Sequence, residues 1–468
     1  MTQTAAKLDA AVWKIVAVVI IGSLLAQLDA TIVNVSLSNL AQDLHTTLST
    51  IQWVTSAYLL ALTFVLPLSG WLVDRIGARA LYLWCFALFT ASSVLCALAW
   101  SAPSLIGLRI LQGASGGLLA PLAQMTIRRA AGVHFTRVAG YAALPVLLGP
   151  LLGPVLAGAI LHALSWRWLF LVNLPVGLLG WLLALRWLPD DLDERRPRAL
   201  DWLGLLLLSP GLALLLVGAE RIGNAHTGSA AGWAMAGGAV LLTLFWRVQK
   251  RKGEHALIDL GQFRGRVFRV AAAAQFLTNG VSFAGQMLIP LFLIDACGQS
   301  PAAMGWLLAP LGLGMMVSYP SLGALVARFG ARAVALGGAL LALAGTLFLV
   351  WQAGHTLALW LLLPALFLRG VGQGAVGLPA ISAAYSRIER RDLAMATTTL
   401  NIVQRLGGPT LTTLCAVALG WLLARRVQAF GLDAWAWAFA LLSGLHALCA
   451  LAAAGLPARA AARAPASG

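Results

Sequence analysis

Charged residues are scarce in this chain, and their scarcity excludes most classes of protein. Of 468 residues only 10% are charged and 60% are hydrophobic, and the mean hydropathy is +0.86. A soluble domain carries about a quarter charged residues, so this chain has too little polar residue to cover a water-exposed surface. Long apolar runs, in place of short alternating strands, also exclude an outer-membrane barrel. The composition therefore predicts an all-α polytopic membrane protein.

Cysteine and histidine are few and scattered, which excludes several kinds of site. The five cysteines form no CxxC pattern, and four of them lie in apolar segments as small packing residues. The seven histidines form no HExxH pattern, and only His446 lies within a predicted span. No nucleophile has a base at a suitable spacing. We therefore expect no disulfide, no metal site, no cofactor and no enzymatic activity.

Apolar segments of about twenty residues, long enough to cross the hydrocarbon core, recur along the chain. Most of the 32 Lys and Arg residues fall in one set of connecting segments, which places this set and both termini in the cytoplasm. The net charge of +16 thus reflects topology and not a nucleic-acid partner. The charged runs 190–198 and 247–269 are expected to be solvated cytoplasmic linkers. Fourteen spans are predicted, near 13–38, 51–70, 80–100, 104–126, 137–161, 167–188, 201–220, 231–248, 268–294, 303–326, 333–352, 357–385, 394–424 and 433–456.

The two halves of the chain repeat one another. The segment 70–79, GWLVDRIGAR, recurs as 323–332, GALVARFGAR, and the pattern LR…QG of 108–113 recurs in 368–374. Spans 1–6 therefore correspond to spans 9–14, and spans 7 and 8 are an insertion. A duplicated six-span unit is typical of transporters, with the binding site at the interface of the repeats. We predict an N-terminal six-helix bundle over 1–188, a linker with two inserted helices over 189–267, a C-terminal six-helix bundle over 268–456 and a cytoplasmic tail over 457–468.

One carboxylate lies where a span should be apolar. Asp29 lies about eight or nine residues from the outer end of span 1, and Arg109 about five residues inside span 4, at compatible depths. Because each charge alone is costly in the bilayer, the two are expected to find each other. Two interpretations stay open. Either protonation of Asp29 releases Arg109 and links proton entry to a conformational change, or the two form a static structural ion pair.

Polar side chains form one stripe on span 1 and another on span 9, its repeat equivalent. Their steps of three or four residues place each set on one helix face. Both stripes are expected to face a central substrate cavity, although polar packing between helices would give the same pattern. Asp29 lies about 200° round the helix from Gln27, which favours coupling through span 4 over contact with substrate. The stripes comprise Ser23, Gln27, Thr31, Asn34 and Ser38 in span 1, and Gln275, Asn279, Ser282 and Gln286 in span 9.

Further side chains complete the predicted cavity. Aromatic and methionine side chains could supply an apolar, adaptable wall, although each taken singly is more simply explained by packing. Two arginines lie near mid-depth in spans 12 and 13 with no acidic residue nearby, and no Asp or Glu occurs between residues 303 and 385. These additional residues are Tyr58, Gln112, Phe276, Phe283, Met315, Met316, Tyr319, Arg369 and Arg405.

Several of these patterns resemble motifs of the major facilitator superfamily. The segment 70–79 resembles its cytoplasmic signature loop, and 108–113 resembles its fourth-helix motif, which is implicated in proton transfer. The segment 149–158, GPLLGPVLAG, resembles the motif of its drug–proton antiporters, with Pro154 in place of the usual second glycine. That proline predicts a stronger bend. Further segments resemble the fourteen-span drug–proton antiporter family, namely 28–35, 52–58, 166–177, 201–204 and 401–408.

The resemblance implies a fold and a function. It implies the major facilitator fold, a proton-coupled antiporter that exports amphipathic drug-like compounds across a bacterial inner membrane, and a possible periplasmic adaptor protein. The alternative is a dedicated exporter of one endogenous metabolite, and Arg369 and Arg405 favour an anionic one. The signature loop would lock the outward-facing state. The residues that the resemblance assigns are Gly70, Asp74, Arg75, Gly77 and Arg79 for the lock, Arg109 for proton transfer, and Gly149, Pro150, Gly153, Pro154 and Gly158 for the antiporter motif. The proton-coupling role of Asp29 rests on its depth and its expected pairing with Arg109.

Overall fold

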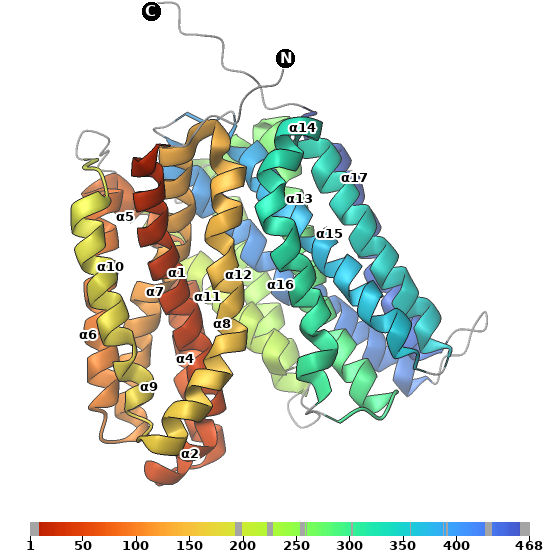
Figure 1. Ribbon diagram of the computed structural model, residues 1–468, viewed down its shortest axis with the longest axis horizontal. Helices are drawn as coiled ribbons and strands as arrows, with labels where there is room; N and C mark the ends of the chain where they lie inside the picture. Colours follow the sequence, from red (N-terminus) through yellow and green to blue (C-terminus); the bar gives the residue numbers. More distant parts are fainter. Residues whose placement is uncertain are drawn as a thin grey trace, which may run out of the picture. The chain divides into compact units, whose positions relative to one another are not determined.

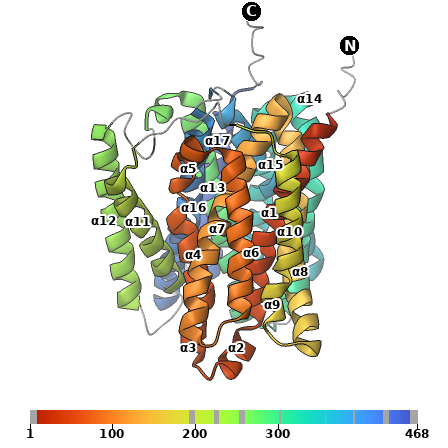
Figure 2. The same cartoon turned by 90° about the vertical axis from the view of Figure 1, so that its left-hand side faces the viewer.

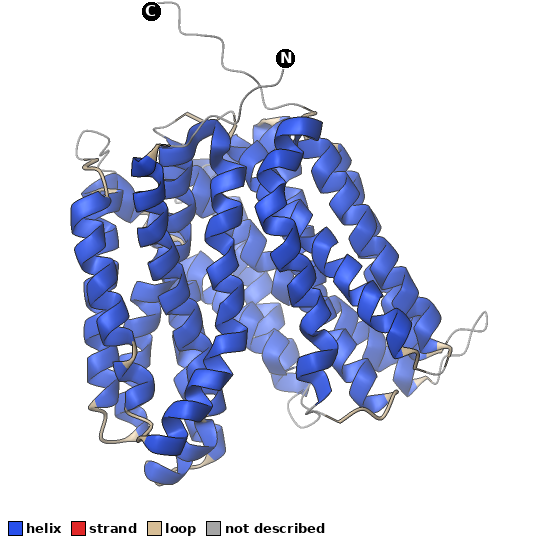
Figure 3. Cartoon of the chain, viewed as in Figure 1, coloured by secondary structure: helices blue, strands red, loops and turns tan. Residues whose placement is uncertain are grey.

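The computed structural model describes residues 9–191, 199–221, 228–252, 258, 260–300, 303–355, 357–386, 388–389, 392–425 and 433–458. Every regular element within these residues is helical, as Figure 3 shows, so the predicted all-α class is confirmed for them. The chain divides into two compact units. The first unit comprises Met1–Ala213, Glu254–Ile258 and Arg390–Thr398, and the second comprises Leu214–Gly253, Asp259–Glu389 and Thr399–Gly468.

The helices of the first unit pack as a bundle around a common apolar core. In it α1 packs against α7, α8 and α10, α4 against α7, and α6 against α7 and α10; Figure 2 shows α4, α7 and α6 side by side. The buried core includes Ile32, Val54, Trp166 and Phe170. The elements are α1 (Ala10–Val35), α2 (Leu37–Asp43), α3 (Leu48–Ile51), α4 (Trp53–Val65), α5 (Leu68–Ile76), α6 (Ala78–Ala97), α7 (Ala102–Ala131), η1 (Gly132–His134), α8 (Phe135–Ala163), α9 (Trp168–Leu171) and α10 (Asn173–Trp187), followed by α11 (Trp202–Arg221), which the two units share.

The second unit is a bundle of longer helices. There α14 packs against α15 and α17, and α13 against α15 and α17, as can be followed in Figure 1. Phe292 on α13 and Phe439 on α17 meet edge to face at the centre of its core. The elements are α12 (Gly228–Lys252), η4 (Leu260–Arg264), α13 (Arg266–Asp295), α14 (Met304–Ala353), α15 (Leu359–Tyr385), α16 (Leu393–Ala424), whose first residues belong to the first unit, and α17 (Ala434–Ala454).

Local sequence signals explain where several helices begin. Before α7, the side chains of Ser101 and Ser104 bond each other's backbone N–H groups in a capping box. The carboxylate of Asp201 accepts from the Gly204 N–H at the start of α11, and that of Asp433 from the Ala436 N–H at the start of α17, both at 2.8 Å. These caps satisfy backbone donors that have no partner within the helix.

Two glycines in the repeated segments share one backbone conformation. Gly77 ends α5 with φ 87° and ψ 156°, and Gly330 interrupts α14 with φ 84° and ψ 159°. A positive φ favours glycine because it has no Cβ. With its 50 residues, an unbroken α14 would be about 75 Å long, more than twice the thickness of a hydrocarbon core. The break at Gly330 therefore divides α14 where Gly77 separates α5 from α6.

The number of membrane spans differs from the prediction. Ten helices among the described residues are long and apolar enough to cross a membrane, or eleven if the bent pair α4 and α5 is one span. The predicted fourteen are thus not confirmed. Three reasons account for the difference: α14 counts as one element, the apolar part of α11 has only 17 residues (Trp202–Gly218), and part of α8 has side chains outside the described residues.

Candidate functional site

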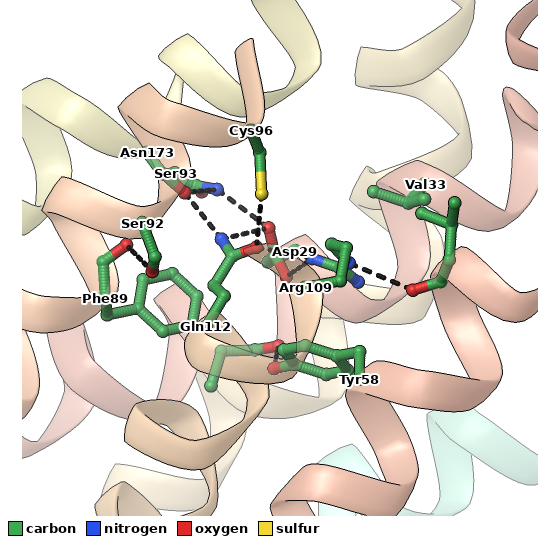
Figure 4. Close-up of polar contacts among 12 residues, drawn as sticks. Asp29, Val33, Tyr58, Phe89, Ser92, Ser93, Cys96, Arg109, Gln112 and Asn173 are labelled. Atoms are coloured by element: carbon green, nitrogen blue, oxygen red, sulfur yellow. Dashed lines mark hydrogen bonds and ion pairs between the residues drawn. The ribbon is translucent and has the colours of Figure 1, made fainter. Parts of the chain in front are cut away.

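Asp29 and Arg109 form an ion pair in the interior of the first unit. Asp29 on α1 and Arg109 on α7 are each 0% exposed, and Arg109 Nη1 lies 2.5 Å from Asp29 Oδ2 (Figure 4). Sequence separation between the two is 80 residues, and only the crossing of α1 and α7 brings them together. The depths read from the sequence were therefore sufficient to predict this contact, since a lone buried charge is strongly unfavourable.

Amides from two other positions complete the shell of the carboxylate. Gln112 Nε2 donates to Asp29 Oδ1 at 3.0 Å, and Asn173 Nδ2 on α10 donates to the same oxygen at 2.9 Å. Both amides also donate to Ser93 Oγ on α6, at 2.5 and 3.0 Å. Figure 4 shows the resulting network. All three groups that contact the carboxylate are N–H donors, so the site is built for the ionised form of Asp29.

Aromatic rings enclose the guanidinium of Arg109. Its Cζ lies 4.1 Å from the ring centroid of Tyr58 and 5.8 Å from that of Phe170. Arg109 Nε donates to the carbonyl oxygen of Val54 at 3.1 Å. Among the described residues Arg109 Nη2 has no hydrogen-bond partner. Arg109 Nη1 also donates to Gln112 Oε1 at 2.7 Å. The cation is thus held by one carboxylate, one side-chain amide oxygen, one backbone carbonyl and two ring faces, and Nη2 is left unpaired among these residues.

Two glycines of α7 let α4 approach closely enough to form this enclosure. A Cβ at Gly113 would overlap the backbone carbonyl of Tyr58, and one at Gly117 would overlap that of Leu62. The spacing of four residues places both glycines on the same face of α7. The glycine that follows Gln112 therefore has a steric reason. At this level α7 both presents Gln112 to Asp29 and packs closely against α4.

The signature loop contacts the end of α10 and the segment that follows it. Arg79 Nη2 donates to the Leu185 carbonyl at 2.8 Å, and Arg79 Nη1 lies 3.8 Å from Asp190. The Asp191 carboxylate accepts from the backbone N–H of Ala78 at 2.6 Å and pairs with Arg129 at 3.0 Å. The prediction that 190–198 is wholly a solvated linker is therefore wrong for Asp191, which is half-buried and bonded to the start of α6. Residues 192–198 lie outside the described part of the chain.

The remaining lock residues lie as follows. Asp74 is 6% exposed near the end of α5, and Arg75 is exposed with its guanidinium 5.4 Å from the ring of Trp71. A Cβ at Gly70 would meet Thr398 Oγ1 at 2.8 Å. The neighbouring Ser69 hydroxyl bonds that same Thr398 hydroxyl at 2.8 Å. The first unit thus holds α5 directly against the first residues of α16.

The antiporter motif is described only in part. Gly153 on α8 is buried, and a Cβ there would overlap the side chain of Thr31 on α1. Gly158 has no atom within 4 Å of such a Cβ. Gly153 therefore allows α8 to pack closely against α1, and Gly158 has no such packing role against the described residues. The side chains of Pro150 and Pro154 and the surroundings of Gly149, together with the predicted bend, lie outside the described residues.

The predicted cavity residues of the first unit separate into two groups. Gln112 and Tyr58, both 0% exposed, belong to the ion-pair network and not to an open face. Thr31 is half-buried, and its hydroxyl donates to the Gln27 carbonyl at 3.0 Å within α1. Gln27 is half-buried, and the side chain of Asn34 lies outside the described residues.

The predicted cavity residues of the second unit also differ in exposure. Phe283 is 50% exposed and, like Asn279, lies against Gly408 of α16; Gln286 is exposed and Arg405 half-buried. Two others are enclosed. Gln275 donates to the Gly377 carbonyl at 2.5 Å, and Arg369 is 1% exposed. An accessible polar face therefore exists on α13, and Arg369 lies away from it.

Sequence reasoning missed three residues of these networks. Ser93 and Asn173 have small polar side chains on otherwise apolar helices, and Asp191 lies in a charged run. Ser93 and Asn173 could have been found as polar side chains on largely apolar helices, a pattern that indicates a contact to another helix. Asp191 lies outside any helix and gave no such signal.

Comparison with known proteins places this chain among membrane transporters. The family model described as Major Facilitator Superfamily matches residues 19–412 and 270–467. A multidrug resistance protein B homolog of Mycobacterium tuberculosis is 34% identical over 427 residues, which is 88% of this chain and 77% of that protein. The Salmonella typhi protein MdtD, also named for multidrug resistance, is 34% identical over 337 residues, 71% of each chain.

Solved structures show the same fold at low sequence identity. The human organic anion transporter MFSD10 superposes with a TM-score of 0.65 at 19% identity, covering 94% of this chain and 99% of that one. The proton:xylose symporter XylE gives 0.62 at 16% identity, covering 94% of each chain. Two transporters of different substrates thus have similar folds, so the fold alone does not assign a substrate.

Proposed function

The chain belongs to the major facilitator superfamily, a family of transporters and not of enzymes, and from this premise we propose that it is a proton-coupled antiporter that exports amphipathic, drug-like compounds. It is a multi-pass membrane protein that moves a small molecule. The names of its relatives favour drug-like substrates and a role in antibiotic resistance. The single observation that carries proton coupling is the fully buried pair Asp29–Arg109.

The coupling step follows from the contacts of Asp29. In the ionised state its carboxylate accepts from Arg109, Gln112 and Asn173. When a proton enters from outside and binds Asp29, the carboxyl group loses its charge and one of its acceptor positions becomes a donor. Arg109 is then a buried cation without a counter-ion, which favours a rearrangement of α7 against α1. Release of the proton inside restores the pair and resets the cycle.

The proposal includes an architecture for alternating access. We propose fourteen spans with both termini in the cytoplasm of a bacterial inner membrane. Eleven spans are long enough to cross the membrane when the bent pair α4 and α5 is one of them. Counting α14 as two helices divided at Gly330, and adding α8 and α11, gives fourteen. Residues 1–188 and 268–456 would rock against each other, with 189–267 as an inserted pair and 457–468 as a tail. The accessible face of α13 with Asn279, Phe283 and Gln286 would bind substrate.

Proton flux in everted vesicles tests the proposal. Under an imposed pH gradient, addition of a transported compound should release protons from wild-type vesicles. Asp29→Asn should abolish that release while substrate exchange without a gradient persists. Asp43→Asn, which removes an exposed carboxylate at the end of α2, is the matched control and should behave as wild type. Unchanged proton release in Asp29→Asn would leave the pair as a static structural element.

A second candidate function is export of one anionic metabolite. Arg369 and Arg405 on α15 and α16 favour it, because neither helix contains an acidic residue. A substrate panel of cations, neutral compounds and carboxylates in the same vesicles separates the candidates. Proton release with cations alone contradicts anion export, and release with carboxylates alone contradicts the drug-like assignment. An accompanying periplasmic adaptor would show as a requirement for a second protein in whole-cell export but not in vesicles.

A further inference from the structure

Arg369 is a buried cation for which the described residues supply almost no polar contact. Its side chain projects from α15 and is 1% exposed. Arg369 Nη2 donates to the Val281 carbonyl of α13 at 3.0 Å. Among the described residues Nε and Nη1 have no hydrogen-bond partner. A guanidinium stays protonated in proteins, so this group remains a charge and cannot become neutral by losing a proton.

The helices of the second unit contain almost no carboxylate that could neutralise Arg369. No Asp or Glu occurs within α12, α14, α15, α16 or α17; α13 contains only its last residue, Asp295, and the part of α11 in the second unit contains only Glu220, one residue before its end. Asp295 lies ten residues beyond Gly285, whose Cα faces the guanidinium, and therefore about 15 Å along the helix. The Cys415 thiol and the His446 imidazole are within electrostatic reach of Arg369, but neither is a carboxylate.

The first unit shows what such an arginine requires. Arg109 is the repeat equivalent of Arg369 in the pattern LR…QG. Arg109 faces α1 and pairs there with Asp29, and Arg369 faces α13, where it meets a backbone carbonyl and Gly285. A Cβ at Gly285 would overlap the guanidinium, so no side chain fits at that position. The second unit therefore lacks the counter-ion that the first unit carries on its corresponding helix.

We propose that Arg369 binds a small monovalent anion of halide size, which supplies the negative charge that Asp29 supplies to Arg109. In the described part of the chain Nη1 carries two unpaired N–H groups and Nε carries one, on different sides of the guanidinium, and donors of either kind can bind such an anion. One guanidinium calls for one negative charge. Enclosure of the side chain favours a small ion over the carboxylate of a large substrate, since the site lies away from the exposed face of α13. The inference does not depend on which compound is transported or on its coupling to protons.

Chloride is the probe for a first test, with the full-length protein in detergent and no substrate. Tryptophan fluorescence follows thermal unfolding while chloride replaces gluconate at constant ionic strength. The wild-type Tm should rise by roughly 1–3 °C for each tenfold increase in chloride above its Kd. Arg369→Met should unfold at a Tm that is independent of chloride. Arg328→Met, which removes an exposed arginine of the same unit, should keep the wild-type response.

A second variant keeps the test decisive if Arg369→Met does not fold. Cys415→Asp places a carboxylate within reach of the guanidinium, so it should raise the Tm in gluconate and remove the chloride response. Cys415→Ser is the control and should keep the response. An absent response in the wild type, or an undiminished one in Arg369→Met or Cys415→Asp, overturns the proposal. A response to acetate but not to chloride that requires Arg369 also overturns it, in favour of a carboxylate subsite.

Discussion

Replacing Asp29 by Asn tests how strongly the ion-pair network depends on charge. Asn has the same shape, but one of its two terminal atoms is an N–H donor. Every described contact to the Asp29 carboxylate comes from a donor on Arg109, Gln112 or Asn173. In Asp29→Asn at least one donor therefore faces another donor, and Arg109, which is 0% exposed, loses its counter-ion.

The expected cost follows from this uncompensated charge. Breaking a buried ion pair by removing one partner costs about 3–5 kcal/mol. Asp29→Asn and Arg109→Gln should each lower the free energy of unfolding by about this amount. The double variant should lose much less than the sum, because it removes both charges together. The pair then shows a coupling energy of several kcal/mol.

Unfolding in mixed micelles with increasing sodium dodecyl sulfate measures these free energies, with tryptophan fluorescence as the signal. The wild type, the two single variants and the double variant form a double-mutant cycle. Arg405→Gln combined with Asp29→Asn is the control pair, because the two residues belong to different units. If the Asp29 and Arg109 effects add within about 0.5 kcal/mol, the pair contributes no interaction energy and our reasoning is refuted.

Three further predictions follow from contacts in the first unit. Gly153→Val should disrupt the packing of α8 on α1 and lower expression and Tm, whereas Gly158→Val, with no atom within 4 Å, should have little effect. Asp191→Asn should lower the free energy of unfolding by about 1–3 kcal/mol in the same micelle titration. Asp190→Asn, at its exposed neighbour, should lower it by less than about 1 kcal/mol. Tyr58→Leu should cost about 1–2 kcal/mol through the lost cation–π contact, and Tyr58→Phe should retain it; equal costs for both would assign the loss to the hydroxyl.

Individual residues show which parts of this protein could be predicted from its sequence. The pairing of Asp29 with Arg109 was predictable because the free-energy cost of a lone buried charge leaves few alternatives, and helix rise gives each residue's depth. The glycines of 70–79 and 323–332 were recognisable as repeats, and Gly77 and Gly330 have nearly the same backbone angles. The first inference uses a strong energetic constraint and the second uses local spacing in the sequence. Neither requires knowledge of how the helices pack.

Contacts between helices distant in sequence could not be predicted in the same way. Asp191 was assigned to a solvated run because its neighbours are charged, yet its carboxylate caps a helix 113 residues earlier in the chain. Gln112 was assigned to the cavity, but the crossing of α7 with α1 turns it onto Asp29. Helical phase alone tells which residues share a face and does not tell which helix that face meets. Ser93 and Asn173 escaped notice for the same reason.

The distribution of carboxylates makes the two units chemically unequal despite their repeat. Among the described helices, Asp29 is the only Asp or Glu in the interior of a long one, since the other acidic residues of those helices lie in short α2, in the signature segment or near helix ends. A protonation step that uses a buried carboxylate must therefore involve the first unit, and Arg369 cannot take part in one through a resident acid. Among the described helices of the second unit no carboxylate lies in a helix interior, so under our proposals the proton site lies in the first unit and the anion site beside Arg369 in the second.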